Sequence, residues 1–110
     1  MLEFENFHAH VYFDSESKNT ALALREKIAK AFPELTLGRV WESCVGPHPC
    51  PSYQIAFGQS SFQSLISFLM QERASLDIFI HADTGADIVD HTQYVLWLGK
   101  SYALNLEKLK

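Results

Sequence analysis

Histidine is the residue type most able to do chemistry in this sequence. The chain has five, and each lies in an apolar or turn-forming segment: His8, His10, His48, His81 and His91. A neutral imidazole is the commonest nitrogen ligand for metal ions, and its pKa of about 6.5 also suits it to proton transfer. Histidines that come together in the fold would therefore form a metal site with acid–base chemistry beside it.

The segment that carries His8 and His10 has the alternation of a β-strand. Residues 4–13 read FENFHAHVYF, and a period of two places His8, His10 and Tyr12 on one face. The opposite face carries apolar residues: Phe7, Ala9, Val11 and Phe13. We expect the apolar face to pack on helices and the histidine face to stay open, with Tyr12 available to contact a substrate.

Periodic segments further along the chain predict the elements that position the other histidines. Apolar residues recur at helical spacing over 18–32, which Pro33 ends, and over 62–73, capped by Ser60 or Ser61. Strand patterns cover residues 35–45, 53–57, 76–82 and 94–98, separated by the rigid loop 46–52 and the turn-rich segment 83–90. This order predicts an α+β, ferredoxin-like βαββαβ antiparallel sheet with two helices on one face. A C-terminal strand and extension follow, with a short helix at the end.

This topology predicts that the histidines converge. We expect the first strand to lie at the centre of the sheet, antiparallel to the fourth strand and parallel to the third. The start of the first strand, with His8 and His10, would then lie near His81 and near the loop that carries His48. His91 follows ten residues after His81 and can fold back to the same rim. The C-terminal extension, a second subunit or a substrate would cover this face.

Length and composition exclude several classes of protein. The 110 residues predict one domain over 1–110, with a net charge of −4 and 20% charged residues. Without a cluster of Lys and Arg, nucleic acid is not an expected partner. The sequence has no apolar run near the ~20 residues of a membrane span and no signal peptide, which indicates a cytoplasmic protein without a membrane partner. In a cytoplasmic protein we expect Cys44 and Cys50 to be reduced, with a disulfide as the alternative, and their separation of six residues is not that of a zinc ribbon.

Several short motifs, in this order, resemble the DOPA 4,5-dioxygenase family. They are HAHVYF at 8–13, GPHP at 46–49, YQIAF at 53–57, His81 followed by Thr84 and Gly85, and DHT at 90–92. The resemblance extends over nearly the whole chain, to residues 97–99. It implies a ferredoxin-like fold and a non-haem metal enzyme. Such an enzyme would open a catechol ring outside the two hydroxyls with molecular oxygen.

The resemblance also implies roles for the histidines. His10, His48 and His81 are the first candidates for metal ligands, and His8 would be a fourth ligand or the acid/base. His91 would be the acid/base or would support a ligand, with Asp90 as its orienting partner.

The sequence leaves more than one metal and more than one activity open. Fe(II) is expected for ring cleavage, whereas a set of histidines suits Zn(II) equally well. A zinc-dependent hydrolase or lyase, or a non-catalytic module that binds a metal or small molecule, would use the same residues. A homodimer across the open sheet face is also expected. The physiological substrate stays open.

Overall fold

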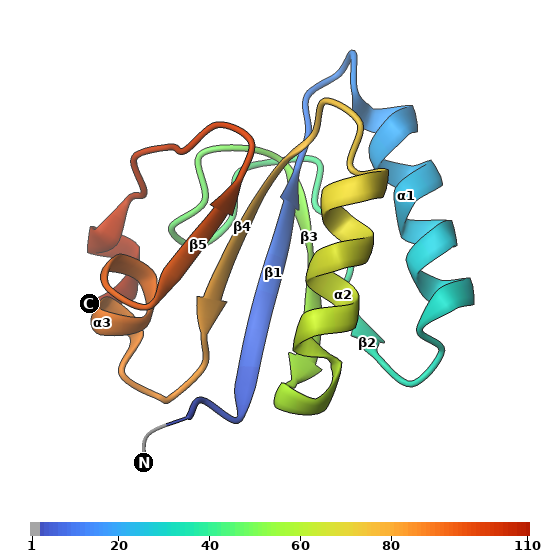
Figure 1. Cartoon of the computed structure of the whole chain (residues 1–110). Helices are drawn as coiled ribbons and strands as arrows, with labels where there is room; N and C mark the ends of the chain where they lie inside the picture. The colour runs from blue at the N-terminus through green and yellow to red at the C-terminus, as the bar shows by residue number, and fades with distance from the viewer. Residues whose placement is uncertain (1–2) are drawn as a thin grey trace.

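Five β-strands form one antiparallel sheet in the computed structural model, which describes residues 3–110 (Figure 1). The spatial order is β2-β3-β1-β4-β5, with bounds β1 Asn6–Tyr12, β2 Thr36–Leu37, β3 Ser52–Gly58, β4 Asp77–Ala82 and β5 Val95–Leu98. Helices α1 (Lys18–Ala31) and α2 (Gln59–Glu72) lie together on one face. The α+β, ferredoxin-like architecture predicted from the order of elements is confirmed, including a fifth strand.

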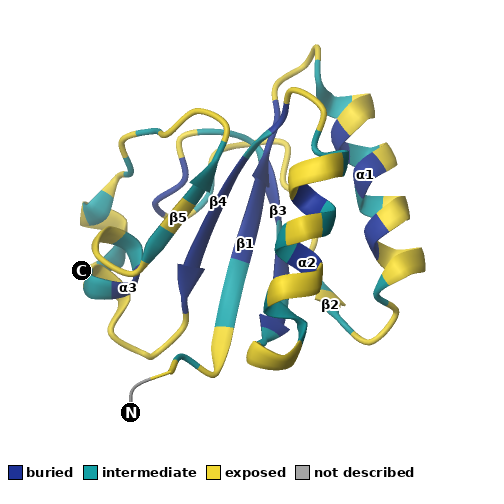
Figure 2. Cartoon of the chain, viewed as in Figure 1, coloured by how far each residue is buried: buried dark blue, intermediate teal, exposed yellow. Residues whose placement is uncertain are grey.

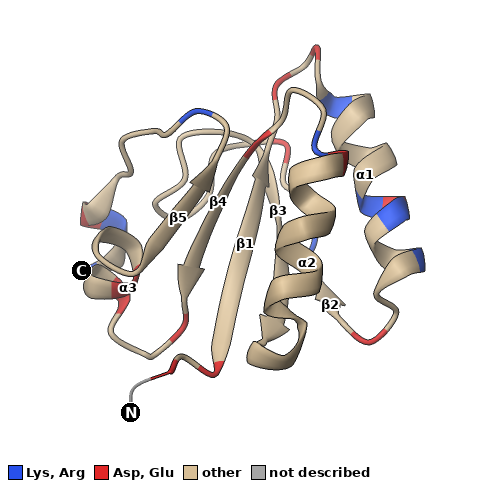
Figure 3. Ribbon diagram, in the orientation of Figure 1, with Lys and Arg blue, Asp and Glu red and all other residues tan. Residues whose placement is uncertain are grey.

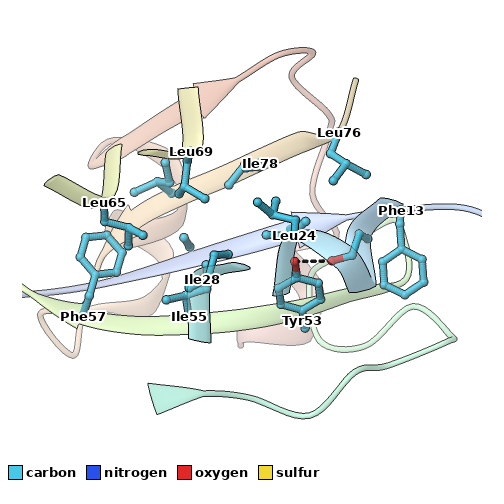
Figure 4. Close-up of a cluster of buried hydrophobic side chains, with 14 residues drawn as sticks. Phe13, Leu24, Ile28, Tyr53, Ile55, Phe57, Leu65, Leu69, Leu76 and Ile78 are labelled. Carbon is cyan, nitrogen blue, oxygen red and sulfur yellow. Dashed lines mark hydrogen bonds between the residues drawn. The ribbon is translucent and has the colours of Figure 1, made fainter. Parts of the chain in front are cut away.

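The hydrophobic core fills the space between the two helices and the sheet. Figure 2 shows the buried inner stripes of α1 and α2 turned toward the buried strands. The strands contribute alternate residues, as predicted for β1, and the helices contribute residues at helical spacing: Ala9, Val11, Ile55, Ile78, Leu24, Ile28, Leu65 and Leu69. Tyr53 anchors this layer, because its buried hydroxyl donates a hydrogen bond to the Ala21 carbonyl at 2.7 Å (Figure 4). The histidine face of β1 therefore lies opposite the helices.

The pairing of β1 with β3 differs from the prediction. The two strands are antiparallel, with Phe7 opposite Phe57 and Tyr12 opposite Ser52. The crossover through α1 makes β2 parallel to β1, and β3 enters between them and runs the other way. The loop before β3 therefore begins at the end of β1 rather than at its start, so the reasoning that brought His48 to His8 was wrong.

The strand predicted over residues 35–45 is much shorter. Only Thr36–Leu37 forms β2, and an isolated bridge joins Trp41 to Ser52. Between these pairings Arg39 and Val40 stand opposite the single residue Tyr53, which is the arrangement of a β-bulge. The bulge ends regular pairing, and the chain continues as a loop from residue 42 to residue 51.

Two helix boundaries also differ from the prediction. α2 begins at Gln59, three residues early, because the extended backbone of Gly58 serves as the N-cap in place of Ser60 or Ser61. The segment predicted as a turn-rich loop contains a short helix, α3 (Asp87–Thr92). Four of the six residues of α3 are polar, so the segment has no apolar stripe to detect and only its packing reveals the helix.

The chain after β5 folds back over the open face of the sheet. The Tyr102 hydroxyl donates to Asp77 Oδ2 at 2.7 Å, and the Asn105 N–H donates to the Pro47 carbonyl at 2.9 Å. The short helix predicted at the end of the extension is a 3₁₀ turn, η1 (Leu106–Leu109). The C-terminal extension is thus one of the predicted covers of this face. Over residues 3–110, no helix has the length and apolar character needed to cross a membrane.

Candidate metal and active site

Three histidines meet on the face of the sheet opposite the helices. His8 and His10 come from β1 and His81 from β4, and the strand register places His8 directly opposite His81. One nitrogen from each ring lies within 4.8 Å of the others. The closest pair is His10 Nε2 and His81 Nε2, at 3.0 Å. Three imidazole nitrogens at these separations can hold a single metal ion.

Hydrogen bonds orient the two buried rings of this cluster. The His81 Nδ1 donates to the Ala82 carbonyl at 2.8 Å, because a carbonyl can only accept. The neutral His81 ring therefore carries its lone pair on Nε2, the atom that faces His10. A backbone partner on the far nitrogen is the usual support of a metal-ligating histidine.

Burial keeps these rings neutral. It is the largest cause that lowers the pKa of His81 to about 4 and the pKa of His10 well below its usual value. The neighbouring rings of His48 and His81 lower the pKa of His10 further. Neutral imidazoles present lone pairs without competition from protons, so the donor set fits a metal cation at neutral pH.

His8 is the accessible member of the cluster. Its side chain is 25% exposed, and its Nε2 lies 3.4 Å from the Asp83 carboxylate. Burial lowers the pKa of His8, and the charge of Asp83 opposes that shift. A cavity of about 370 Å³ opens beside His8 and Asp83, with Thr36 and Ala56 in its wall. A small molecule can therefore approach the cluster from the side of His8.

His48 reaches the site because its loop folds across the open face. Its ring centroid lies 4.0 Å from that of His10, and its Nδ1 shares a hydrogen bond of 2.9 Å with the Tyr12 hydroxyl. Burial lowers the pKa of His48 to about 4 and raises the pKa of Tyr12. Tyr12 is 2% exposed, so its hydroxyl orients His48 and does not face solvent.

α3 places His91 on the other side of the cluster. The His91 and His81 ring centroids are 4.0 Å apart, and His91 Nδ1 donates to the Asp87 carbonyl at 2.7 Å. The lone pair of the neutral His91 ring is thus on Nε2. The Asp90 carboxylate accepts hydrogen bonds from Thr84 and none from His91, so Asp90 does not orient His91 by direct contact. Figure 3 shows acidic residues, in red, on the ribbon just after β4 and on α3.

The structure brings all five histidines to one face, although by a different route for His48. The three nitrogens closest to a common centre belong to His8, His10 and His81, whereas the sequence favoured His48 over His8. Sequence reasoning missed Asp83 as the partner of His8. Its place directly after β4, next to the start of β1, was the available signal.

Comparison with known proteins relates this site to a family. The model of the Dopa 4,5-dioxygenase family matches residues 7–108. The DOPA 4,5-dioxygenase of Amanita muscaria is 34% identical over 97% of this chain, and an uncharacterized 21.2 kDa protein of Botryotinia fuckeliana is 31% identical over 94%. The chain spans 50% and 63% of the length of these two curated relatives.

A solved structure agrees in fold as well as in sequence. The crystal structure of a "putative dioxygenase" from Nostoc punctiforme superposes with a TM-score of 0.93 and is 44% identical. The match covers 96% of this chain and 91% of that one. With the family match over residues 7–108, these relationships show that the chain belongs to the DOPA 4,5-dioxygenase family.

Proposed function

We propose that this protein is a metal-dependent dioxygenase that opens a catechol ring beside its two hydroxyls, the extradiol reaction. The observation that carries the proposal is the group of three imidazole nitrogens within 4.8 Å in a chain of a dioxygenase family. His8, His10 and His81 would hold the metal, and His48 stands beside His10 as a further ligand or its support. O2 and a small catechol, of which DOPA is one, are the proposed substrates.

The residues around the cluster would position the catechol and move its protons. The cavity beside His8 supplies the approach, and its volume of about 370 Å³ accommodates one aromatic ring. His91 holds a lone pair on Nε2 next to His81 and can accept a proton from a catechol hydroxyl. His8, paired with Asp83, is the second group able to carry a proton there. A bound metal would supply positive charge that favours the catecholate and, as Fe(II), the redox chemistry that O2 requires.

One observation favours a second candidate, a zinc-dependent hydrolase or lyase. The close nitrogen cluster contains histidines and no carboxylate, and three histidines with an open position are typical of catalytic Zn(II). The common non-haem Fe(II) site has two histidines and one carboxylate. Metal identity therefore decides between the two candidates, and the test must vary the metal.

The decisive experiment measures oxygen uptake by protein that is stripped of metal and reconstituted anaerobically. Samples loaded with Fe(II) or Zn(II) receive DOPA or a simple catechol, while visible absorption follows a yellow semialdehyde. We expect one O2 consumed for each yellow product with Fe(II), and none with Zn(II). Stoichiometric metal binding without uptake for either catechol would refute ring cleavage and favour the zinc enzyme or a binding module.

Two variants show whether the histidine cluster carries the metal. His10→Ala should lower the bound metal well below one equivalent, because it removes the nitrogen that lies 3.0 Å from His81 Nε2. Cys44→Ser is the matched control, since Cys44 is an exposed free thiol that could bind metal adventitiously. Metal stoichiometry unchanged in His10→Ala would show that the ligands lie elsewhere. Sedimentation equilibrium of the same samples tests the predicted homodimer, which a monomeric mass at tens of micromolar would remove.

A further inference from the structure

Asp90 is a buried carboxylate that the proposed reaction does not use. It is 1% exposed, and both of its oxygens are occupied by one residue, Thr84. Oδ2 accepts the Thr84 backbone N–H at 2.7 Å, and Oδ1 accepts the Thr84 hydroxyl at 2.7 Å. Hydrogen bonds to an ionised carboxylate are short and strong, which matches both distances. The side chain is therefore held in one orientation.

These bonds close the chain between β4 and α3. Gly85 turns the chain with a φ of 96°, a left-handed conformation that favours glycine. Thr84 lies before this turn and Asp90 lies on α3 after it, so their contact ties the helix to the end of β4. A helix of six residues is not stable without such contacts. Through its two bonds to Thr84, the Asp90 side chain attaches α3 to the loop that follows β4.

We propose that Asp90 is a positioning residue, which acts through Thr84 to hold His91 over His81. Successive residues of a helix point about 100° apart, so fixing the direction of Asp90 fixes the rotation of α3 and the direction of His91. The ring centroids of His91 and His81 are 4.0 Å apart in this arrangement. The loop that contains Thr84 also carries Asp83, which pairs with His8. The same contact thus stabilises both sides of the histidine cluster.

The placement of His91 stands without a catalytic role, whereas the importance of Asp90 for turnover rests on the proposed function.

The test uses metal-free protein, so that it does not depend on activity. With ¹⁵N-labelled histidine, we measure the nuclear Overhauser effect between the ring protons of His81 and His91. Asp90→Ala should weaken this effect at least threefold, because it removes both bonds to Thr84. Asp90→Asn keeps an oxygen for the Thr84 N–H and an amide for the hydroxyl, and should retain the effect. Glu26→Gln, which removes one exposed carboxylate on α1, is the charge control and should match the natural protein.

The backbone spectrum establishes that each variant is folded. If Asp90→Ala does not fold, Thr84→Val decides, because it keeps the backbone bond to Asp90 and removes only the hydroxyl of an exposed residue, with its bonds to Asp90 and to the Ala86 N–H. We expect it to weaken the ring contact at least twofold. An unchanged contact in the folded Asp90→Ala protein or, where that protein does not fold, in Thr84→Val overturns the proposal. The proposal is also overturned if Asp90→Asn weakens the His81–His91 Overhauser effect as much as Asp90→Ala does. The hydrogen bonds to Thr84, which Asn can still make, would then not be the cause.

Zn(II) titration by calorimetry extends the test to the metal. Residues that support metal ligands typically change affinity by about 10- to 100-fold, so we expect Asp90→Ala to weaken Zn(II) binding about tenfold. Unchanged affinity in Asp90→Ala overturns the contribution of Asp90 to the metal site. If the natural protein binds no Zn(II) while the ring contact depends on Asp90, the metal-dependent function fails and the positioning role stands.

Discussion

The metal-free protein should be unstable in mild acid because its histidines are buried as neutral rings. Burial lowers the pKa of His48 and of His81 to about 4, below the usual value of 6.5. Between pH 6.5 and about 4, the unfolded chain therefore binds more protons than the folded chain. Stability is fully present above pH 6.5 and is lost as the pH falls from about 6.5 toward about 4.

The size of this loss follows from the two pKa values. A difference of roughly 2.5 pH units corresponds to about 3.5 kcal/mol for each histidine, at ~1.4 kcal/mol per unit. Both side chains are more than nine-tenths buried, so solvent screens little of this energy. The pair contributes up to about 7 kcal/mol, and His10 acts in the same direction. Since domains are stable by about 5–15 kcal/mol, the metal-free protein should approach unfolding near the lower end of this pH range.

Urea unfolding in the presence of a chelator, between pH 7.5 and 5, measures the effect. The free energy of unfolding should fall by more than 1.4 kcal/mol per unit below pH 6.5, which is the limit for one titrating group. His48→Gln should reduce the slope. Tyr53→Phe is the control: it removes the bond to the Ala21 carbonyl and lowers stability at every pH without changing the slope. A urea midpoint that is equal at pH 7 and pH 5 would refute the reasoning.

Three further predictions concern the supports of the site and the core. Tyr12→Phe leaves the buried His48 Nδ1 without its bond, which should cost about 1–3 kcal/mol in urea unfolding; an unchanged midpoint would contradict this. Truncation after residue 103 removes the Asn105 bond to Pro47 and should speed amide hydrogen exchange in the His48 loop, whereas equal exchange rates would show that the loop holds itself. Leu65→Ala should cost about 2–5 kcal/mol by thermal unfolding, because Leu65 is fully buried, and a smaller loss would mean that the core collapses around the gap.

The β1 histidines show how much local pattern can predict. Alternation in residues 4–13 assigned His8 and His10 to the face opposite the apolar core, and the structure has them there. The period of a strand depends only on backbone geometry, so one segment suffices for this prediction. The order of helices and strands similarly predicted the architecture and the contact between β1 and β4.

Other features depended on contacts between different segments of the chain, which the pattern of any one segment cannot show. The direction of β3 relative to β1 follows from the path of the whole chain through α1 and β2. The bulge at Arg39 and Val40 shortened β2, although the residue types favoured a longer strand. α3 was missed because its six residues have no apolar stripe and are stabilised by the contact between Asp90 and Thr84.

By itself, the sequence determined the fold class, the faces of the strands and the five histidines that could do chemistry, because periodicity and residue type are local properties. Only the tertiary structure decided which nitrogens share a centre. His8 enters the close cluster through its register with His81, and His48 arrives with a loop that the C-terminal segment holds. Such distances arise from packing between residues far apart in the chain, where a shift of one residue in the register of β1 would have moved His8 and His10 to the other face.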